Sequence, residues 1–418
     1  MVNRRGLNRS RIPALVRRGA TWLGAVGLLL AGSGLAGAVP ADAAAAHTVS
    51  QAGPYSGAAG WWDTTQPGIA AQALVRPVAI SGNIAVGGAP AAKGAQGVAY
   101  VWFHEGGSQT WRKVATLPDP RKAKDDYYAW AVAVSSTKSG TYLAIGGNDD
   151  NGDPDRVYIY TGSGTSWHLQ YTIDDPGPSF VDMYGDNLAI SPTTLVVGAS
   201  CGPANKGAAY IYRHEGKRWL LQKSIQDPRH TSADFFGQAV AVSGDRVMIG
   251  EVGYVYVYTQ KSGQWTQTAR ITHPGSSADS FGRSVALSST GTTAVIAAPG
   301  VPPIGAAYVY HLSGTTWSRK QELTRTGGGG EFAWAVAMSG SELLVGMPYG
   351  GQPNCGTAFA YRLSGTQFAL QKEISDPDSS CTSSDNFGAA AAMTNTFGVF
   401  GAPGADNGQG ANYELPVP

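Results

Sequence analysis

Short segments of alternating apolar and polar residues recur along most of this chain, separated by turns rich in Gly and Ser. The clearest example spans Asp279–Leu323. The pair Phe281-Gly282 opens an alternating run, which is followed by an apolar run ending in Ala-Pro-Gly, a Tyr-rich run and a run led by Trp317. Alternation with a period of two is typical of strands with one buried face. The segment therefore predicts a unit of four short strands.

The unit occurs seven times. Each copy opens with an aromatic residue, or with leucine in the first copy, and successive copies begin 45 to 56 residues apart. The opening residues are Leu74, Tyr128, Tyr184, Phe236, Phe281, Phe332 and Phe387. Alanine stands five positions after each of them, and Ser or Thr stands seven positions after. We expect this Ser or Thr to start a tight turn, as in Ser243–Asp245, by bonding its own backbone. Tandem units of about 50 residues are typical of propellers. We therefore predict an all-β fold, a seven-bladed β-propeller of four-stranded antiparallel blades.

Aromatic residues also recur in the third and fourth strands. Tyr308, Tyr310 and Trp317 show the spacing, and we interpret such residues as packing between blades rather than as an array for stacking sugars. The last copy ends at Tyr413–Leu415, before its fourth strand. Because an open strand edge favours aggregation, we expect the segment Trp61–Thr65 to supply that strand, so that an N-terminal strand closes the propeller.

The pattern DxFGxxVAxSG…VGAPxxxxGAAYVY in these units resembles the FG-GAP repeat of bacterial secreted proteins. It is also similar to the repeats in the N-terminal β-propeller of the integrin α-subunit. The resemblance covers about residues 68–418 and implies a seven-bladed propeller with a role in recognition. Integrin-type repeats hold calcium in an Asp-rich loop between the first two strands. Here a short turn such as Ser81–Asn83 or Ser243–Asp245 stands there, with too few oxygens for calcium.

The first 43 residues have the organisation of a secretory signal. Six Arg precede an apolar stretch at Gly19–Val39, and Ala41–Ala43 is a small-residue cleavage site. The alternative is a transmembrane anchor, and the export route, Sec or twin-arginine, stays open. We predict a signal peptide over residues 1–43, a flexible leader over 44–57 and the FG-GAP-type propeller over 58–418. The expected location is extracellular.

Composition narrows the range of partners. Gly accounts for 57 of 418 residues and charged residues for 14%, which fits a turn-rich all-β protein. Residues 1–43 hold six Arg and one Asp, so the rest of the chain has 24 basic and 28 acidic residues and a net charge of −4. That charge gives no basis for binding nucleic acid or an anionic membrane. We expect a monomer without stable membrane insertion once the signal is removed.

Motifs of common enzyme classes are absent from the sequence. The seven His show no metal-ligand spacing, and His104 and His214 both precede Glu-Gly in a repeated turn after the third strand. There is no zinc motif, nucleophile elbow or phosphate loop. No acid stands where a strand needs an apolar residue, so no carboxylate pair for glycoside cleavage is indicated. We predict no cofactor and no catalytic residue.

Two local features concern calcium and disulfide bonding. Asp149–Asp155 spaces its oxygens by two, but its Gly is fourth rather than sixth, so we favour a solvated acidic turn over a calcium loop. Cys355 and Cys381 lie in connections that leave one blade on the same face. We predict a Cys355–Cys381 disulfide, with Cys201 in a distant blade outside it. The alternative is three thiols.

One position differs from copy to copy, two residues after the opening aromatic. Its occupants are Arg76, Trp130, Asp186, Gln238, Arg283, Trp334 and Ala389. Since every first strand is entered from the same end of its blade, these residues should surround one mouth of the central channel. The six residues other than Ala389 suit a polar ligand with an apolar face, such as a sugar, and we predict them as ligand-binding. A shortened connection at Glu251–Gly253 should leave a notch on that rim. The alternative is that Trp130 and Trp334 only fill the channel.

Two classes of function follow. The favoured one is a secreted, non-catalytic module that binds a surface glycan or a protein. The alternative is a secreted carbohydrate-active hydrolase or lyase built on the same propeller, because one propeller architecture hosts many functions. The sequence does not name the ligand.

Overall fold

The computed structural model describes most of the chain from residue 77 onward. The described residues are 61–62, 77–105, 111–122, 126–138, 140–148, 154–177, 183–201, 207–229, 235–273, 275, 279–326, 330–351, 355–377, 381, 385–405 and 411–416. The chain divides into two compact units, Met1–Ala52 and Gly53–Pro418, and every described residue belongs to the second. The predicted signal peptide and leader lie outside the described residues. No helix in the described part of the chain is long and apolar enough to cross a membrane.

The described strands form seven four-stranded sheets, which are the blades. Blades 1 and 2 comprise β2 (Val78–Ser81), β3 (Ile84–Ala89), β4 (Val98–His104) and β5 (Trp111–Pro118), then β6 (Ala131–Thr137), β7 (Gly140–Gly147), β8 (Arg156–Ser163) and β9 (Ser166–Asp174). Blades 3 and 4 comprise β10 (Tyr184–Ile190), β11 (Thr194–Ala199), β12 (Ala208–Glu215) and β13 (Arg218–Gln226), then β14 (Ala239–Ser243), β15 (Arg246–Glu251), β16 (Tyr254–Lys261) and β17 (Gln264–Thr272).

The remaining blades follow the same order. Blades 5 and 6 comprise β18 (Val285–Leu287), β19 (Thr293–Ala298), β20 (Ala306–Ser313) and β21 (Thr316–Thr324), then β22 (Ala335–Ser339), β23 (Glu342–Met347), β24 (Thr357–Ser364) and β25 (Gln367–Ser375). Blade 7 comprises β26 (Ala390–Met393), β27 (Phe397–Ala402), β28 (Ala411–Pro416) and β1 (Trp61–Trp62). A short helix, α1 (Ala92–Ala95), follows β3.

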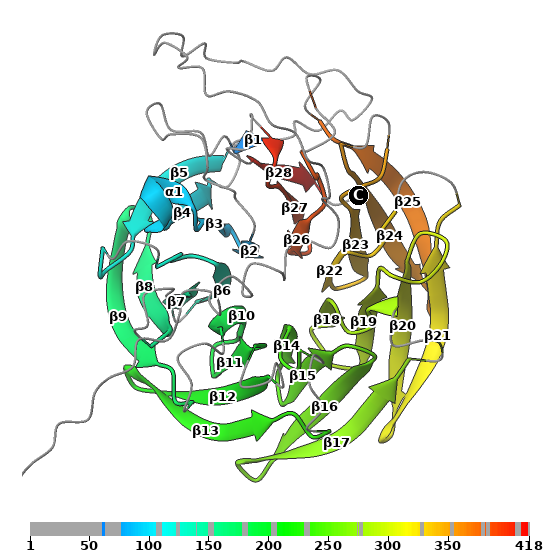
Figure 1. The fold of residues 1–418 in the computed structure, drawn as a ribbon, viewed down its shortest axis with the longest axis horizontal. Helices are drawn as coiled ribbons and strands as arrows, with labels where there is room; N and C mark the ends of the chain where they lie inside the picture. The colour runs from blue at the N-terminus through cyan, green and yellow to red at the C-terminus, as the bar shows by residue number, and fades with distance from the viewer. Residues whose placement is uncertain are drawn as a thin grey trace, which may run out of the picture. The chain divides into compact units, whose positions relative to one another are not determined.

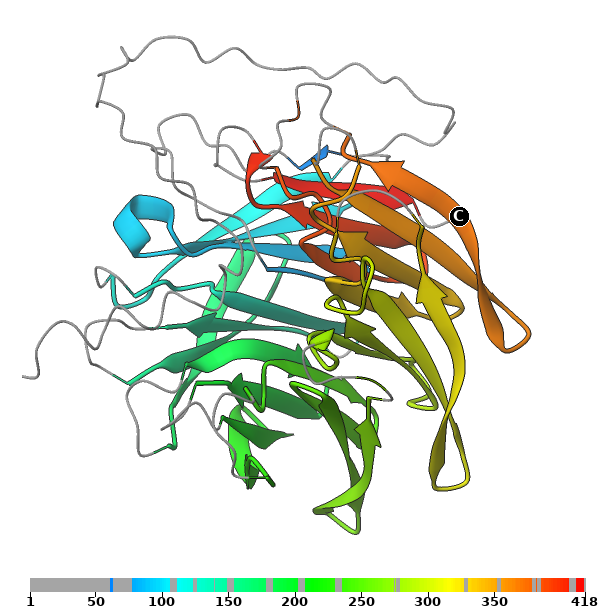
Figure 2. The same ribbon diagram turned by 45° about the vertical axis from the view of Figure 1, so that its right-hand side comes forward.

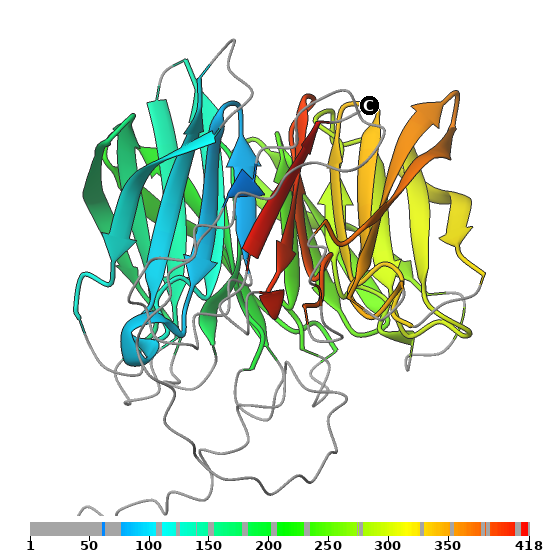
Figure 3. The same cartoon turned by 90° about the horizontal axis from the view of Figure 1, so that it is seen from above.

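The blades surround a central axis with their first strands innermost and their fourth strands outermost (Figure 1). Each sheet twists strongly between its inner and outer strands (Figure 2), as the chirality of β-strands requires. Seen from the side, the inner strands run roughly along the axis (Figure 3). This arrangement is the predicted seven-bladed propeller.

The N-terminal strand completes the last blade. β1 pairs antiparallel with β28, where Trp61 is opposite Tyr413 and Trp62 is opposite Asn412. The strand order of this sheet is β1-β28-β27-β26, so the outer position is taken from the other end of the chain. His104 at the end of β4 packs against Phe397 of β27, with ring centroids 4.6 Å apart, which joins blade 1 to blade 7 a second time. The predicted closure is thus present in the structure.

The aromatic residues of the repeat pack within and between blades, as predicted. The opening aromatic residues from Tyr128 to Phe387 are fully buried. Each lies near the first aromatic residue of its third strand, and the edge-on pairs Tyr128–Tyr158, Tyr184–Tyr210 and Phe236–Tyr256 all have centroids 5.4 Å apart. Such geometry favours aromatic pairs beyond the burial of their area. His214 likewise stacks on Trp219 at 4.8 Å; it lies within β12, not in the turn that follows.

Glycine allows neighbouring blades to approach closely. A Cβ atom added at Gly346, near the end of β23, would lie 2.0 Å from the carbonyl oxygen of Gly388 in the next blade. The same contact recurs at Gly88, Gly146, Gly198 and Gly250, where the added atom would lie 2.1 to 2.2 Å from a carbonyl oxygen of the next blade. The receiving Gly388 has a φ of 92°, a conformation that favours glycine. The glycine after the opening aromatic residue and the glycine near the end of the second strand therefore form the two sides of one contact between blades, which explains why both recur.

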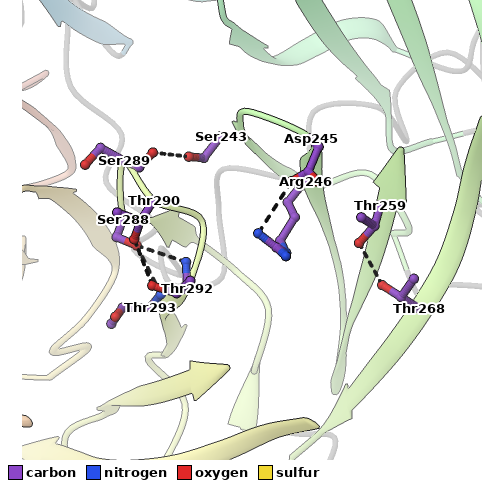
Figure 4. A network of polar contacts seen from close by, with 10 residues as sticks. All are labelled: Ser243, Asp245, Arg246, Thr259, Thr268, Ser288, Ser289, Thr290, Thr292 and Thr293. Atoms are coloured by element: carbon purple, nitrogen blue, oxygen red, sulfur yellow. Dashed lines mark hydrogen bonds and ion pairs between the residues drawn. The ribbon is translucent and has the colours of Figure 1, made fainter. Parts of the chain in front are cut away.

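The turns that join first to second strands lie at the end of the inner strands away from the turns that lead into them. Ser288 Oγ accepts hydrogen bonds from the backbone N–H groups of Thr292 and Thr293, at 3.2 and 3.0 Å (Figure 4). This is the predicted self-bonded turn, and it is stabilised without any ligand. Ser243 behaves differently from our expectation, because its hydroxyl donates to the carbonyl oxygen of Ser289 in the next blade, at 3.0 Å.

Candidate functional site

The residues at the variable position occupy the same backbone turn in successive blades. The backbone N–H groups of Trp130, Asp186, Gln238, Arg283 and Ala389 donate to the carbonyl oxygens of Tyr127, Met183, Phe235, Ser280 and Asn386, at 3.1, 3.1, 2.9, 3.1 and 3.1 Å. The N–H of Trp334 donates to Gly346 O, as that of Trp130 does to Gly146 O, both at 3.1 Å. Arg76 lies outside the described residues. The turns lead into the innermost strands (Figure 1), so these residues lie at one end of the ring of inner strands, here called the mouth.

Arg283 and Trp334 lie in contact across the junction of blades 5 and 6. The guanidinium carbon of Arg283 lies 4.2 Å from the centroid of the Trp334 ring. Tyr349, in the connection that follows β23, packs edge-on against Trp334 with centroids 6.0 Å apart, and it is 38% exposed. Arg283 and Trp334 are themselves half-buried. The structure thus brings two of the predicted ligand-binding residues together and adds Tyr349, which the sequence did not indicate.

Glu331 belongs to the same group. It stands three residues before Trp334, and its Oε2 atom is buried with no hydrogen bond from the residues that the structure describes. Burial raises the pKa of the Glu331 carboxyl, and the positive charge of Arg283 acts in the opposite direction. We call Arg283, Glu331, Trp334 and Tyr349 the mouth cluster.

Trp130 lies in blade 2, away from the mouth cluster of blades 5 and 6. It is half-buried, and its ring packs edge-on against Tyr127 with centroids 6.2 Å apart. The two tryptophans of the predicted set therefore form two separate aromatic groups rather than one.

Asp186 and Gln238 are directed into the protein. The carboxylate of Asp186 accepts a hydrogen bond from Ser200 Oγ, and burial raises the pKa of Asp186 to about 7. Gln238 is only 9% exposed. Their role in binding a ligand stays a prediction.

The two mouth tryptophans follow residues in an unusual conformation. Ala129 and Ala333 each have a φ of 67°, where the equivalent Gly185, Gly237 and Gly282 have φ values of 89° to 95°. A left-handed alanine costs about 1 kcal/mol or more relative to glycine. Both alanines are fully buried. Among the copies whose turn the structure describes, alanine replaces glycine at the two residues that precede Trp130 and Trp334.

The short connection of blade 4 is contacted by a side chain from the connection before it. β15 ends at Glu251 and β16 begins at Tyr254, so the connection is a two-residue turn. Arg229, from the preceding connection, forms an ion pair with Glu251 and lies 4.2 Å from the centre of the Tyr254 ring. The notch expected on the rim stays a prediction, and the sequence did not indicate that Arg229 contacts this turn.

Buried acids were missed by the sequence analysis. Glu251, at the end of a strand, is fully buried, and Glu342 at the start of β23 is 6% exposed and paired with Arg362. Asp227 is also fully buried, and its Oδ1 accepts the backbone N–H of Arg229 at 2.7 Å. The available signal was the Asp-Pro pair after the fourth strand, since Asp side chains bond the backbone two residues on in such turns. These contacts are structural.

The calcium hypothesis concerns Asp149–Asp155, and the structure describes only the end of that segment. Asp149 to Asp153 lie outside the described residues, and Asp155 is buried and accepts the N–H of Tyr184 at 3.1 Å. Among the described residues, no group of three or more His, Cys, Asp or Glu is arranged to hold a metal ion.

The predicted disulfide is present. Cys355 and Cys381 are bonded, with their Cα atoms 5.9 Å apart and a sequence separation of 26. The backbone carbonyl of Cys355 also accepts the N–H of Phe387 at 2.8 Å, which ties the connection after β23 to blade 7. Cys201 is partly buried and takes no part in the bridge.

Comparison with known families agrees with the fold. The family model of the FG-GAP repeat matches residues 265–310. That segment contains Phe281-Gly282, whose glycine carbonyl receives the contact from Gly250, and Ala297-Ala298-Pro299 at the end of β19. No curated protein matches the chain.

Proposed function

We propose that this seven-bladed β-propeller, in which residues 265–310 match the FG-GAP repeat, acts as a secreted, non-catalytic recognition module whose ligand binds at the mouth. The ligand is a glycan or a protein displayed on a surface. The observation that carries this proposal is the contrast between a uniform turn backbone and its variable side chain. Packing accounts for the residues on either side of that position, but it does not require Trp, Arg or Ala there.

The chemistry of the mouth suits a polar ligand with an apolar face. Trp130 with Tyr127, and Trp334 with Tyr349, offer aromatic surfaces on which such a face can lie. Arg283 adds hydrogen-bond donors held against one of those surfaces. The net charge of −4 without residues 1–43 supports a ligand other than nucleic acid.

The test is capture of labelled surface polysaccharides and surface proteins by residues 44–418. We expect retained binding without turnover, and loss of binding in a Trp130→Ala/Trp334→Ala variant with a native melting curve. Leu221→Ala/Leu370→Ala is the matched control, because these side chains are 45% and 40% exposed on outer strands. Release of new reducing ends would instead favour the hydrolase alternative. Undiminished binding by the double Trp variant would place the site elsewhere.

A further inference from the structure

We propose that the mouth cluster binds a neutral pyranose through two adjacent hydroxyl groups, with Arg283 as donor, Glu331 as acceptor and Trp334 with Tyr349 as the apolar wall. The inference rests on the proposed function and deepens it, because it names one class of ligand for one part of the mouth.

The wall consists of two rings that meet at an angle. The planes of Trp334 and Tyr349 are 81° apart, and Tyr349 is the more exposed ring. Two rings in this arrangement form a corner rather than a flat surface. The C–H face of a pyranose ring can pack against one side of such a corner while its hydroxyl groups point away.

Arg283 is held in place by the same wall. Its guanidinium lies over the Trp334 ring, so one face of the group is covered. A guanidinium carries five N–H donors in one plane. Stacking also reduces the freedom that Arg283 would lose on binding, which favours hydrogen bonds to ligand oxygens.

Glu331 supplies the acceptor that an alcohol needs. A buried carboxylate oxygen without a donor is unfavourable, and Oε2 of Glu331 has no hydrogen bond from the described residues. The residue as a whole is only partly buried. A hydroxyl group is both donor and acceptor, so neighbouring hydroxyls satisfy Glu331 and Arg283 together.

The balance of charge selects a neutral ligand. Arg283 and Glu331 contribute one positive and one negative charge, and each influences the other, as the effect of Arg283 on the Glu331 carboxyl shows. A uronate would gain from Arg283 but be repelled by Glu331, and a charged amino sugar would face the reverse. A neutral sugar is repelled by neither residue.

In the sequence, an acid in this turn is combined with Arg and Trp at one junction, that of blades 5 and 6. The residue that precedes the opening aromatic in the seven copies is Ala73, Tyr127, Met183, Phe235, Ser280, Glu331 and Asn386. Glu331 is the one acid in this series. Asp186, the acid at the variable position itself, is engaged by Ser200 in its own blade. The one acid of this series therefore stands in the turn that leads to Trp334.

The experiment is calorimetric titration of residues 44–418 with neutral hexose oligosaccharides and with the uronate oligosaccharides of matching linkage. We expect the neutral series to bind at least about tenfold more tightly, because one repulsive charge contact costs on that order. Arg283→Gln should weaken neutral binding by about tenfold. Glu331→Gln should weaken neutral binding and strengthen uronate binding. Glu322→Gln, an exposed acid paired with Arg319 on an outer strand, should change neither.

Tyr349→Ala provides a second variant at an exposed position, so folding does not limit the test. It should weaken binding of neutral sugars with an unchanged melting curve. A preference for uronates in the unmodified protein, or an unchanged preference in Glu331→Gln, would overturn the inference. If no sugar binds but a protein is captured and its capture needs Trp130 and Trp334, the sugar inference fails, and the mouth remains the proposed binding site. If capture persists without both tryptophans, the proposed function fails as well.

Discussion

Gly282 and Arg283 are adjacent in the chain and behave in opposite ways. A Cβ atom added at Gly282 would lie 2.5 Å from the carbonyl oxygen of Glu251, in the preceding blade. Arg283 instead extends its side chain to Trp334, on the turn of the following blade. At Gly282 the close approach of two backbones restricts the residue type. At Arg283 the turn accepts several residue types. Constancy among the copies therefore marks the contacts between blades, and variation marks the surface that is open to function.

The largest effect is expected at the glycine contacts. Gly346→Ala should destabilise the fold by more than about 4 kcal/mol, because the new methyl group would lie 2.0 Å from the backbone carbonyl oxygen of Gly388. Gly314→Ala is the control, since that turn glycine has a φ of 60° and open space around it. It should cost only about 1 kcal/mol from backbone strain. Urea denaturation of both variants measures the difference, and similar losses would contradict the steric explanation.

Asp186 should make stability depend on pH. Burial raises its folded pKa from 3.8 to about 7, so the folded protein keeps a proton that the unfolded chain loses. Its contribution is complete below about pH 4 and is lost as the pH rises through about 7, at about 1.4 kcal/mol per pH unit. Asp186→Asn should remove this slope and be the more stable protein at pH 8. Denaturation at pH 5 and pH 8 tests this, and parallel pH profiles for both proteins would refute it.

The disulfide should contribute less to stability than the glycine contact between blades. Replacing Cys355 and Cys381 by Ser opens a loop with a sequence separation of 26 and should cost about 3 kcal/mol. Cys201→Ser should have a much smaller effect. Thermal denaturation with and without a reducing agent gives the same comparison, and a melting temperature insensitive to reduction would argue against this contribution.

Ala333→Gly should have the smallest effect. The glycine relieves a φ of 67° but removes a buried methyl group, and these terms of about 1 kcal/mol each oppose one another. We expect a change within about 1 kcal/mol by urea denaturation. A loss of several kcal/mol would mean that Ala333 belongs to the constrained part of the repeat, which would narrow the region left to function.

Much of the fold could be predicted from the sequence because the repeat is short and its demands are local. The aromatic residue, Ala and Ser offsets placed every first strand, and the missing fourth strand pointed to Trp61. The turns around Arg229 and Glu251 could not be predicted, because their partners come from another blade. For the candidate site, the variable position was found by comparing copies. The contact of Trp334 with Tyr349 and the inward direction of Asp186 depend on packing that spacing does not encode.

The most direct test of the account is hydrogen–deuterium exchange of residues 44–418, with and without the ligand obtained by capture. The account predicts slower exchange in the turns 127–130, 280–283 and 331–334, and unchanged exchange in the outer strands β9, β13 and β25. Slower exchange confined to those outer strands, with the mouth turns unaffected, would contradict it.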